Sequence, residues 1–173
     1  WLVADRVEAI AIAGLGEIAP GDDLPALVAS AVAASTEVLP LRDDDALVVT
    51  QKIVSKAEGA IVDLTMVTPR PEAIAFSAEW DRDPRQVEVV LRESKRIIRQ
   101  IGPVLITETH HGFCCANSGV DQSSSGAHGR VLVLPKDSDA SARGFRARFA
   151  ELGVEVAVVI SDTFGRPWRE GQT

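Results

Sequence analysis

Ala46-Leu47-Val48-Val49-Thr50 is the stretch that decides the fold class. It is a continuous apolar run after the acidic turn Asp43-Asp44-Asp45, which is typical of a strand buried on both faces. A similar run at residues 154–160 follows a helical pattern, and it too is predicted to be a buried strand. Strands that alternate with helices predict an α/β fold with a parallel or mixed sheet and flanking helices.

Helical periodicity marks the segments between these strands. Apolar residues recur at helical spacing from Leu24 to Val32, after Asp22 or Asp23 as the N-cap. A further helix is predicted to begin at Asp137 or Ser138 and to end at Gly153, and residues 72–80 are also predicted to be helical. These helices would flank the sheet.

The most regular helical pattern begins at Asp83-Pro84. Its apolar stripe continues through residues 87–101, it includes a Glu88–Arg92 pair at i,i+4 spacing, and Gly102-Pro103 stops it. We therefore predict one helix over this whole segment. Short strands are predicted at residues 7–12, 104–107 and 131–134, with a long Gly/Ser-rich loop over residues 110–129.

Composition narrows the class of protein. The 173 residues are 46% hydrophobic and 25% charged, as in soluble globular proteins, and the net charge of −7 argues against a nucleic-acid partner. No apolar run has the length of a membrane span and no signal peptide is recognisable. Because the two cysteines are adjacent, they do not form a disulfide framework, and a cytoplasmic location is expected.

Four polar segments follow apolar strands: residues 15–18, 51–56, 117–125 and 161–169. If those strands share one sheet, the four segments would converge on one rim, where ligands of α/β proteins gather. Asp121 and Asp162 in these segments are candidate ligands for a hard divalent cation, with a phosphate completing its coordination. The alternative is that each aspartate only satisfies its own turn.

Local positive charge stands out in this acidic chain. Lys52, Lys56, Arg166 and Arg169 lie in the same segments and suit phosphate or carboxylate ligands. The alternative is that they are solvated cations or partners of the acidic turn at residues 43–45. No P-loop, Rossmann glycine motif or nucleophile elbow occurs, so any nucleotide site would be of another type.

Histidine and cysteine pairs give weaker signals. His110-His111 would face opposite ways on a strand, and no third histidine lies near enough for a zinc site, so one buried, hydrogen-bonded histidine is predicted. Cys114-Cys115 are interpreted as small core residues.

Several segments together resemble the coenzyme F420-0 γ-glutamyl ligases. The resemblance spans nearly the whole chain in order and spacing. The matching segments are residues 14–18 with 20–24, 49–59, 111–113 with 116–121, 134–142, and 158–172.

The resemblance implies a cytoplasmic, homodimeric ligase that joins L-glutamate to F420-0 by an amide bond, through an acyl phosphate formed from GTP. Further γ-linked additions are implied, as are Mn²⁺ or Mg²⁺, with K⁺ as an additional candidate ion. It implies metal ligands at Asp121, Asp162 and Thr163, nucleotide contacts at Leu15, Gly16, Glu17, Ile18, Gln51, Lys56 and Ser124, and catalytic roles for Lys56 and Arg166.

Two departures from the family pattern concern the nucleotide. Gln51 stands where relatives often have serine, and Ser124 where they have asparagine, so GTP and ATP remain open alternatives. Because the chain starts at Trp1 and stops at Thr173, residues 1–173 are expected to be the N-terminal portion of the ligase domain. A related ligase acting on another carboxylate and a non-catalytic nucleotide-binding module are the alternative functions.

Overall fold

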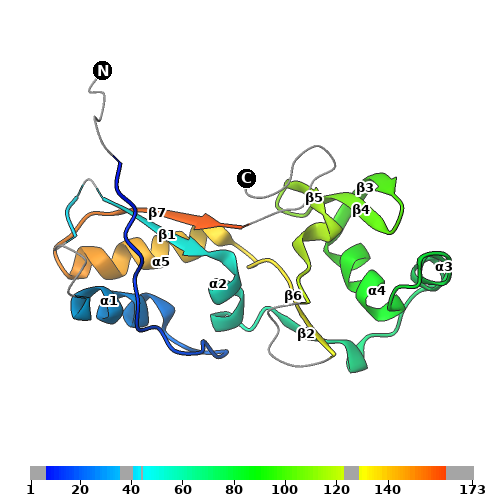
Figure 1. Ribbon diagram of the computed structural model, residues 1–173, viewed down its shortest axis with the longest axis horizontal. Coiled ribbons are helices and arrows are strands. Elements are labelled where there is room, and N and C mark those ends of the chain that lie inside the picture. The colour runs from blue at the N-terminus through cyan, green and yellow to red at the C-terminus, as the bar shows by residue number, and fades with distance from the viewer. Residues whose placement is uncertain (1–6, 36–40, 44, 123–128, 163–173) are drawn as a thin grey trace, which may run out of the picture.

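The computed structural model describes residues 7–35, 41–43, 45–122 and 129–162. Its described part is elongated: helices α1 and α5 and strands β1 and β7 lie at one end, β2 and β6 in the middle, and α3, α4 and β3 to β5 at the other end (Figure 1). The α/β class is confirmed. The described strands, however, form three small sheets, ordered β1-β7, β2-β6 and β3-β4-β5, and not the single sheet on which a shared rim depended.

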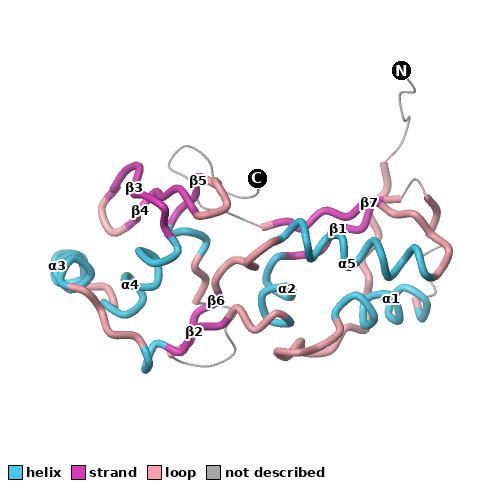
Figure 2. Tube along the Cα trace, turned by 180° about the vertical axis from the view of Figure 1, so that it is seen from behind, coloured by secondary structure: helices cyan, strands magenta, loops and turns pink. Residues whose placement is uncertain are grey.

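The first sheet is the parallel pair of β1 (Ala46–Thr50) and β7 (Ala157–Ser161). One face of this pair is covered by α1 (Leu24–Ala34) and α5 (Ser138–Glu151), as Figure 2 shows from behind, and Phe145 and Phe149 belong to the core there. Val48 of β1 and its partner Val159 of β7 are 64% and 49% exposed. The prediction that β1 is buried on both faces is therefore wrong, because the helices cover one face only. Of residues 154–160, predicted to be a buried strand, residues 157–160 belong to β7, and none of these four is fully buried.

Aspartate caps begin these helices, as the sequence predicts. The side chain of Asp23 accepts a hydrogen bond from the N–H of Ala26, and that of Asp137 accepts one from Ala140. Each bond satisfies a backbone donor that has no partner within the helix. These local signals fix where α1 and α5 start.

The middle of the molecule is an antiparallel pair of short strands, β2 (Ile61–Asp63) and β6 (Arg130–Leu132). The 3₁₀ turn η1 (Leu64–Met66) follows β2, and the fully buried Leu64 and Val131 form part of a second core cluster. The chain thus leaves the first end through β2 and returns to it through β6 (Figure 1).

The other end is built from two helices and a three-stranded antiparallel sheet. The elements are α3 (Pro71–Trp80), α4 (Pro84–Glu93), β3 (Ser94–Ile101), β4 (Val104–Thr109), β5 (Cys114–Ala116) and the 3₁₀ turn η2 (Asn117–Gly119). The helix predicted at residues 72–80 is confirmed as α3. The strand predicted at residues 104–107 is also confirmed, and it extends to Thr109.

The single long helix predicted from Pro84 to the Gly102-Pro103 stop is wrong after Glu93. Residues 94–101 form β3 instead, which pairs with β4 through a turn where Gly102 has φ +54°. Lys95 and Arg96 both form ion pairs with Glu108 on β4. Cross-strand pairing therefore overrides the helical pattern, to which the isoleucines of this segment are weakly suited.

Two other predictions need correction. Residues 7–12 form no strand, because they pair with no described strand, and Val7 is 89% exposed. The predicted loop over residues 110–129 contains β5 and η2 in its described part. Among the described helices, none is long and apolar enough to cross a membrane.

Candidate functional site around helix α2

Helix α2 (Gln51–Ala57) begins directly where β1 ends. Residues 51–56, predicted to be a polar loop, form most of this helix instead. Gln51 is 4% exposed and Ser55 is fully buried; the Gln51 amide donates to the Ser55 hydroxyl, which donates to the carbonyl of Val133 at 2.7 Å. These contacts anchor α2 to the segment that follows β6.

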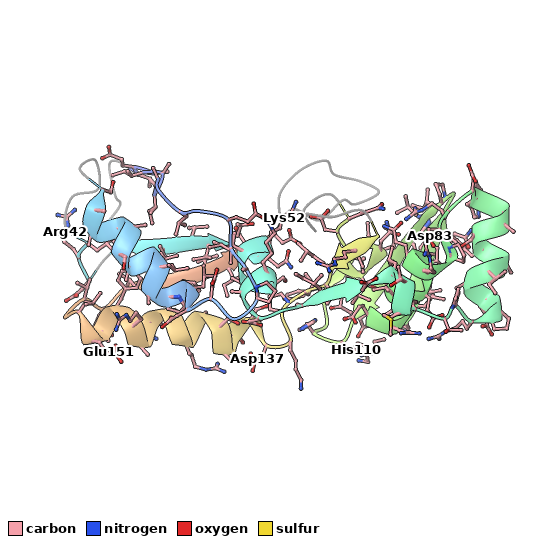
Figure 3. The ribbon with its side chains drawn as sticks, turned by 90° about the horizontal axis from the view of Figure 1, so that it is seen from below. Arg42, Lys52, Asp83, His110, Asp137 and Glu151 are labelled. Carbon is pink, nitrogen blue, oxygen red and sulfur yellow. The ribbon has the colours of Figure 1, made fainter. Side chains whose placement is uncertain are left out.

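The anchored helix holds two lysines, Lys52 and Lys56, that lie four residues apart and therefore share one side of it. Their side chains are 39% and 19% exposed. Figure 3 places Lys52 in the middle of the elongated molecule, between Glu151 near one end and Asp83 toward the other. Each lysine forms an ion pair with a carboxylate from a different segment, and neither partner belongs to the acidic turn at residues 43–45 considered as an alternative.

Lys56 binds the loop at residues 15–18. Its Nζ lies 2.8 Å from Oε1 of Glu17, and this hydrogen bond and charge lower the pKa of Glu17. Ile18 is buried in the core beside Val54, and the N–H of Gly21 donates to the carbonyl of Ala57 at 2.8 Å. The loop implicated in nucleotide contacts is therefore fastened along α2.

Lys52 binds Asp121. Its Nζ lies 2.8 Å from Oδ2 of Asp121, an oxygen that is itself buried. The backbone of Asp121 is fixed by two hydrogen bonds with Leu132 on β6, of 3.0 and 2.8 Å. The carboxylate is thus held in a defined position against α2.

The turn before Asp121 is anchored by a buried hydroxyl network. Ser118 in η2 is 1% exposed, and its hydroxyl lies 2.8 Å from that of Thr107 and 2.7 Å from that of Ser94. It also donates to the carbonyl of Val90, and the side chain of Asn117 accepts from the N–H of Leu105. In the polar segment predicted at residues 117–125, these first two residues therefore hold the turn in place.

Asp162 follows the last residue of the parallel pair. The register pairs Ser161, the last residue of β7, with Thr50, the last residue of β1. Asp162 and Gln51 are the residues that follow these two strands, so Asp162 lies near the start of α2. The structure therefore brings together at α2 the loop at residues 15–18, Asp121 and Asp162.

Carboxylate oxygens of this kind suit Mg²⁺ or Mn²⁺, which proteins bind through one or two carboxylates while substrate phosphates supply further oxygens. Asp121 and Asp162 carry carboxylates of this kind near α2, and their role as metal ligands stays a prediction. Within residues 7–35, 41–43, 45–122 and 129–162, no group of three His, Cys, Asp or Glu side chains gathers as a metal site. The other predicted site residues, Ser124, Thr163, Arg166 and Arg169, lie outside the described residues.

The histidine and cysteine predictions are partly corrected. Both His110 and His111 are exposed, because the turn between β4 and β5 places them at the surface. The Nε2 atom of His110 forms a hydrogen bond with the backbone carbonyl of Arg92, and that of His111 with the carbonyl of Pro135. Cys115 is buried as expected, whereas Cys114 is exposed on β5.

Sequence reasoning missed the two ion pairs of α2 and its anchor at Val133. Lys52 and Lys56 were recognised as strand-end cations, but no local pattern indicated that they bind Asp121 and Glu17. The buried Gln51 and Ser55 share helical i,i+4 spacing, a signal that could have predicted their common inner face.

The sequence is similar to that of known proteins. A family model described as F420-0:Gamma-glutamyl ligase matches residues 13–173. Proteins named Coenzyme F420:L-glutamate ligase are similar in sequence. The one from Methanopyrus kandleri is 46% identical over 157 residues, which cover 90% of this chain and 59% of that protein.

Two further proteins with the same name are also more than 40% identical to this chain. The protein from Methanothermobacter thermautotrophicus is 42% identical over 95% of this chain and 65% of its own length. The protein from Methanocaldococcus jannaschii is 41% identical over 76% of this chain and 53% of its own length. The chain thus spans less than two thirds of the length of these relatives.

Proposed function

The chain belongs to the F420-0:gamma-glutamyl ligase family, and from this premise we propose that the protein joins L-glutamate to coenzyme F420-0 through an amide bond with GTP as the energy source. The observation that carries the proposal is the gathering, around α2, of the three segments expected to bind nucleotide and metal. The loop at residues 15–18 reaches α2 through Glu17, Asp121 through Lys52, and Asp162 through the strand register.

The charges at α2 suit a reaction among anions. A nucleotide, a carboxylate acceptor and glutamate repel one another, and cations placed where charge develops lower that cost. Lys52 and Lys56 provide two such cations on one side of a helix that is anchored from within. We assign to Lys56 the role of neutralising phosphate charge, with Arg166 as a second cation for the same purpose.

Asp121 and Asp162 would hold Mg²⁺ or Mn²⁺, with Thr163 as a further ligand. When bound, the ion would neutralise phosphate charge and help to align the nucleotide with the acceptor. Leu15, Gly16, Glu17 and Ile18 would line the nucleotide together with Lys56 and Ser124. Because the Gln51 side chain is buried toward Val133, a nucleotide contact from Gln51 would be made by its backbone.

The proposed reaction has two steps. A carboxylate oxygen of F420-0 attacks the γ-phosphorus of GTP, so that an acyl phosphate forms and GDP leaves. The amino nitrogen of glutamate then attacks the acyl carbon, the amide bond forms, and phosphate leaves as the nitrogen loses its proton. Further γ-linked additions, a cytoplasmic location, a homodimer and the use of K⁺ are proposed from the family resemblance.

A calorimetric titration tests the nucleotide and metal part of the proposal. GTP, and separately ATP, would be titrated into the intact protein with and without Mn²⁺, and the experiment repeated on Asp162→Ala. We expect GTP binding that requires Mn²⁺ and is lost in the variant. Absence of nucleotide binding under every condition would contradict the proposal. Equal binding of GTP and ATP would show that the site does not select guanine over adenine.

A further inference from the structure

The ammonium group of Lys52 is paired with the Asp121 carboxylate, which a divalent cation would also bind. Its Nζ lies 2.8 Å from Oδ2 of Asp121, and that oxygen is buried. A Mg²⁺ ion coordinates a carboxylate oxygen at about 2.0–2.1 Å, so the ion and the ammonium group compete for the same oxygen. Two positive charges so close also repel each other strongly. Entry of the ion at Asp121 therefore requires Lys52 to move away.

The two partners differ in their freedom to move. Asp121 is held by its backbone bridge to Leu132 and by the turn anchored through Ser118. Lys52 is 39% exposed and has a flexible four-carbon side chain, so it can leave the carboxylate without disturbing α2. The inner face of α2 is bonded to Val133 through Ser55, a contact in which Lys52 takes no part.

Where Lys52 goes depends on what else is bound. Without an anionic ligand, a displaced Lys52 loses Asp121 as its partner and gains no other anion. When a polyphosphate arrives with the ion, its oxygens offer Lys52 a new anionic partner. Breaking the Lys52–Asp121 ion pair thus weakens binding of the cation alone. When the cation and the phosphate bind together, the new contact between Lys52 and phosphate offsets this cost.

We propose that Lys52 is a positioning residue that makes divalent-cation binding at Asp121 conditional on a bound polyphosphate. The inference rests on the proposed function, because it takes Asp121 as a metal ligand. It adds a coupling between the two ligands: the factor by which GTP strengthens Mn²⁺ binding equals the factor by which Mn²⁺ strengthens GTP binding. In Lys52→Met this factor falls.

The test measures Mn²⁺ binding by electron paramagnetic resonance, with and without GTP, in the intact wild-type protein, Lys52→Met and Lys52→Arg. We expect Lys52→Met to bind Mn²⁺ alone about fivefold more tightly than wild type, since a partly exposed ion pair no longer competes. GTP should then strengthen Mn²⁺ binding by a smaller factor. Lys52→Arg keeps the competing cation and should restore the wild-type coupling.

Two controls separate this role from a structural one. Lys95→Met removes a lysine that is also paired with a carboxylate, Glu108 at 3.0 Å, and should leave Mn²⁺ binding unchanged. Asp121→Asn should abolish the Mn²⁺ signal in the presence of GTP. Circular dichroism confirms that each variant is folded.

The outcomes distinguish the inference from the proposed function. If wild type binds Mn²⁺ with GTP but Lys52→Met, correctly folded, shows the wild-type affinity and coupling, or weaker binding of Mn²⁺ alone, the inference is wrong and the metal site stands. If wild type binds no Mn²⁺ with or without GTP, the metal site of the proposed function is wrong, and the inference falls with it.

Discussion

Glu88 on α4 is a buried carboxylate whose replacement should cost a measurable part of the stability. It is 2% exposed, and it accepts hydrogen bonds from the backbone N–H of Arg70 at 2.9 Å, from the Arg70 guanidinium at 3.0 Å, and from Arg92 at 2.7 Å. Burial alone would raise the pKa of Glu88, but the bonds to the two arginines outweigh it and lower the pKa from 4.5 to about 2.

The lowered pKa gives the size and the pH range of the effect. The fall from 4.5 to about 2 corresponds to about 3 kcal/mol at neutral pH. Because both arginines are 47% exposed, solvent screens part of this, and we expect Glu88→Gln to lose about 2–3 kcal/mol. A carboxylate with a lowered pKa stabilises the fold above its unfolded-state pKa. The difference from wild type should therefore be constant above about pH 5 and shrink as the pH falls from 4.5 toward 2.

Urea denaturation followed by circular dichroism, repeated from pH 7 downward, measures this difference. Glu151→Gln is the control, because its pair with Arg148 lies at the surface with Glu151 66% exposed, and its loss should change stability by less than about 0.5 kcal/mol. A Glu88→Gln protein as stable as wild type at pH 7 would contradict this prediction, as would a difference that does not shrink on acidification.

Two further changes test the anchors of the site. Ser118→Ala removes the hydroxyl that bonds Thr107, so the free energy of unfolding measured by urea denaturation should fall by about 1–3 kcal/mol. Stability unchanged from wild type would show that this network does not hold the turn before Asp121. Gln51→Leu removes an amide bonded to Ser55 and Val133 and leaves the carbonyl of Val133 with one donor, so a loss of about 1 kcal/mol is expected in thermal unfolding. A melting temperature at or above that of wild type would contradict this interpretation of the buried amide.

Local signals determined what the sequence could predict of the fold. Asp23 and Asp137 mark helix starts because a cap interacts only with the next few residues. Residues 94–101 have the spacing of a helix, but they form β3 because β4 pairs with them and Glu108 binds their cations. Such pairing depends on tertiary contacts, which no short window of sequence contains.

For the candidate site, the residues could be predicted from the sequence but their contacts could not. Asp121, Asp162 and Lys56 were identified from their places after apolar segments, and the structure places them at or beside α2. Their contacts were not predictable, because Lys56 meets Glu17 across 39 positions of sequence. Asp121 meets Lys52 of α2 because a backbone bridge to Leu132 on β6 holds it there. The Glu88–Arg92 pair was predictable from its i,i+4 spacing and is confirmed, whereas Arg70, from another segment, was not.

We propose that the protein forms an amide between F420-0 and L-glutamate at the site around α2. The most direct test of this proposal is to incubate the intact protein with F420-0, L-glutamate, GTP and Mn²⁺ and to detect the glutamylated product by mass spectrometry, beside Asp121→Ala and beside other carboxylate acceptors. We expect product with F420-0 only when GTP and Mn²⁺ are present, and none with the variant. Product from Asp121→Ala at the wild-type rate, or a preference for another acceptor, would contradict it.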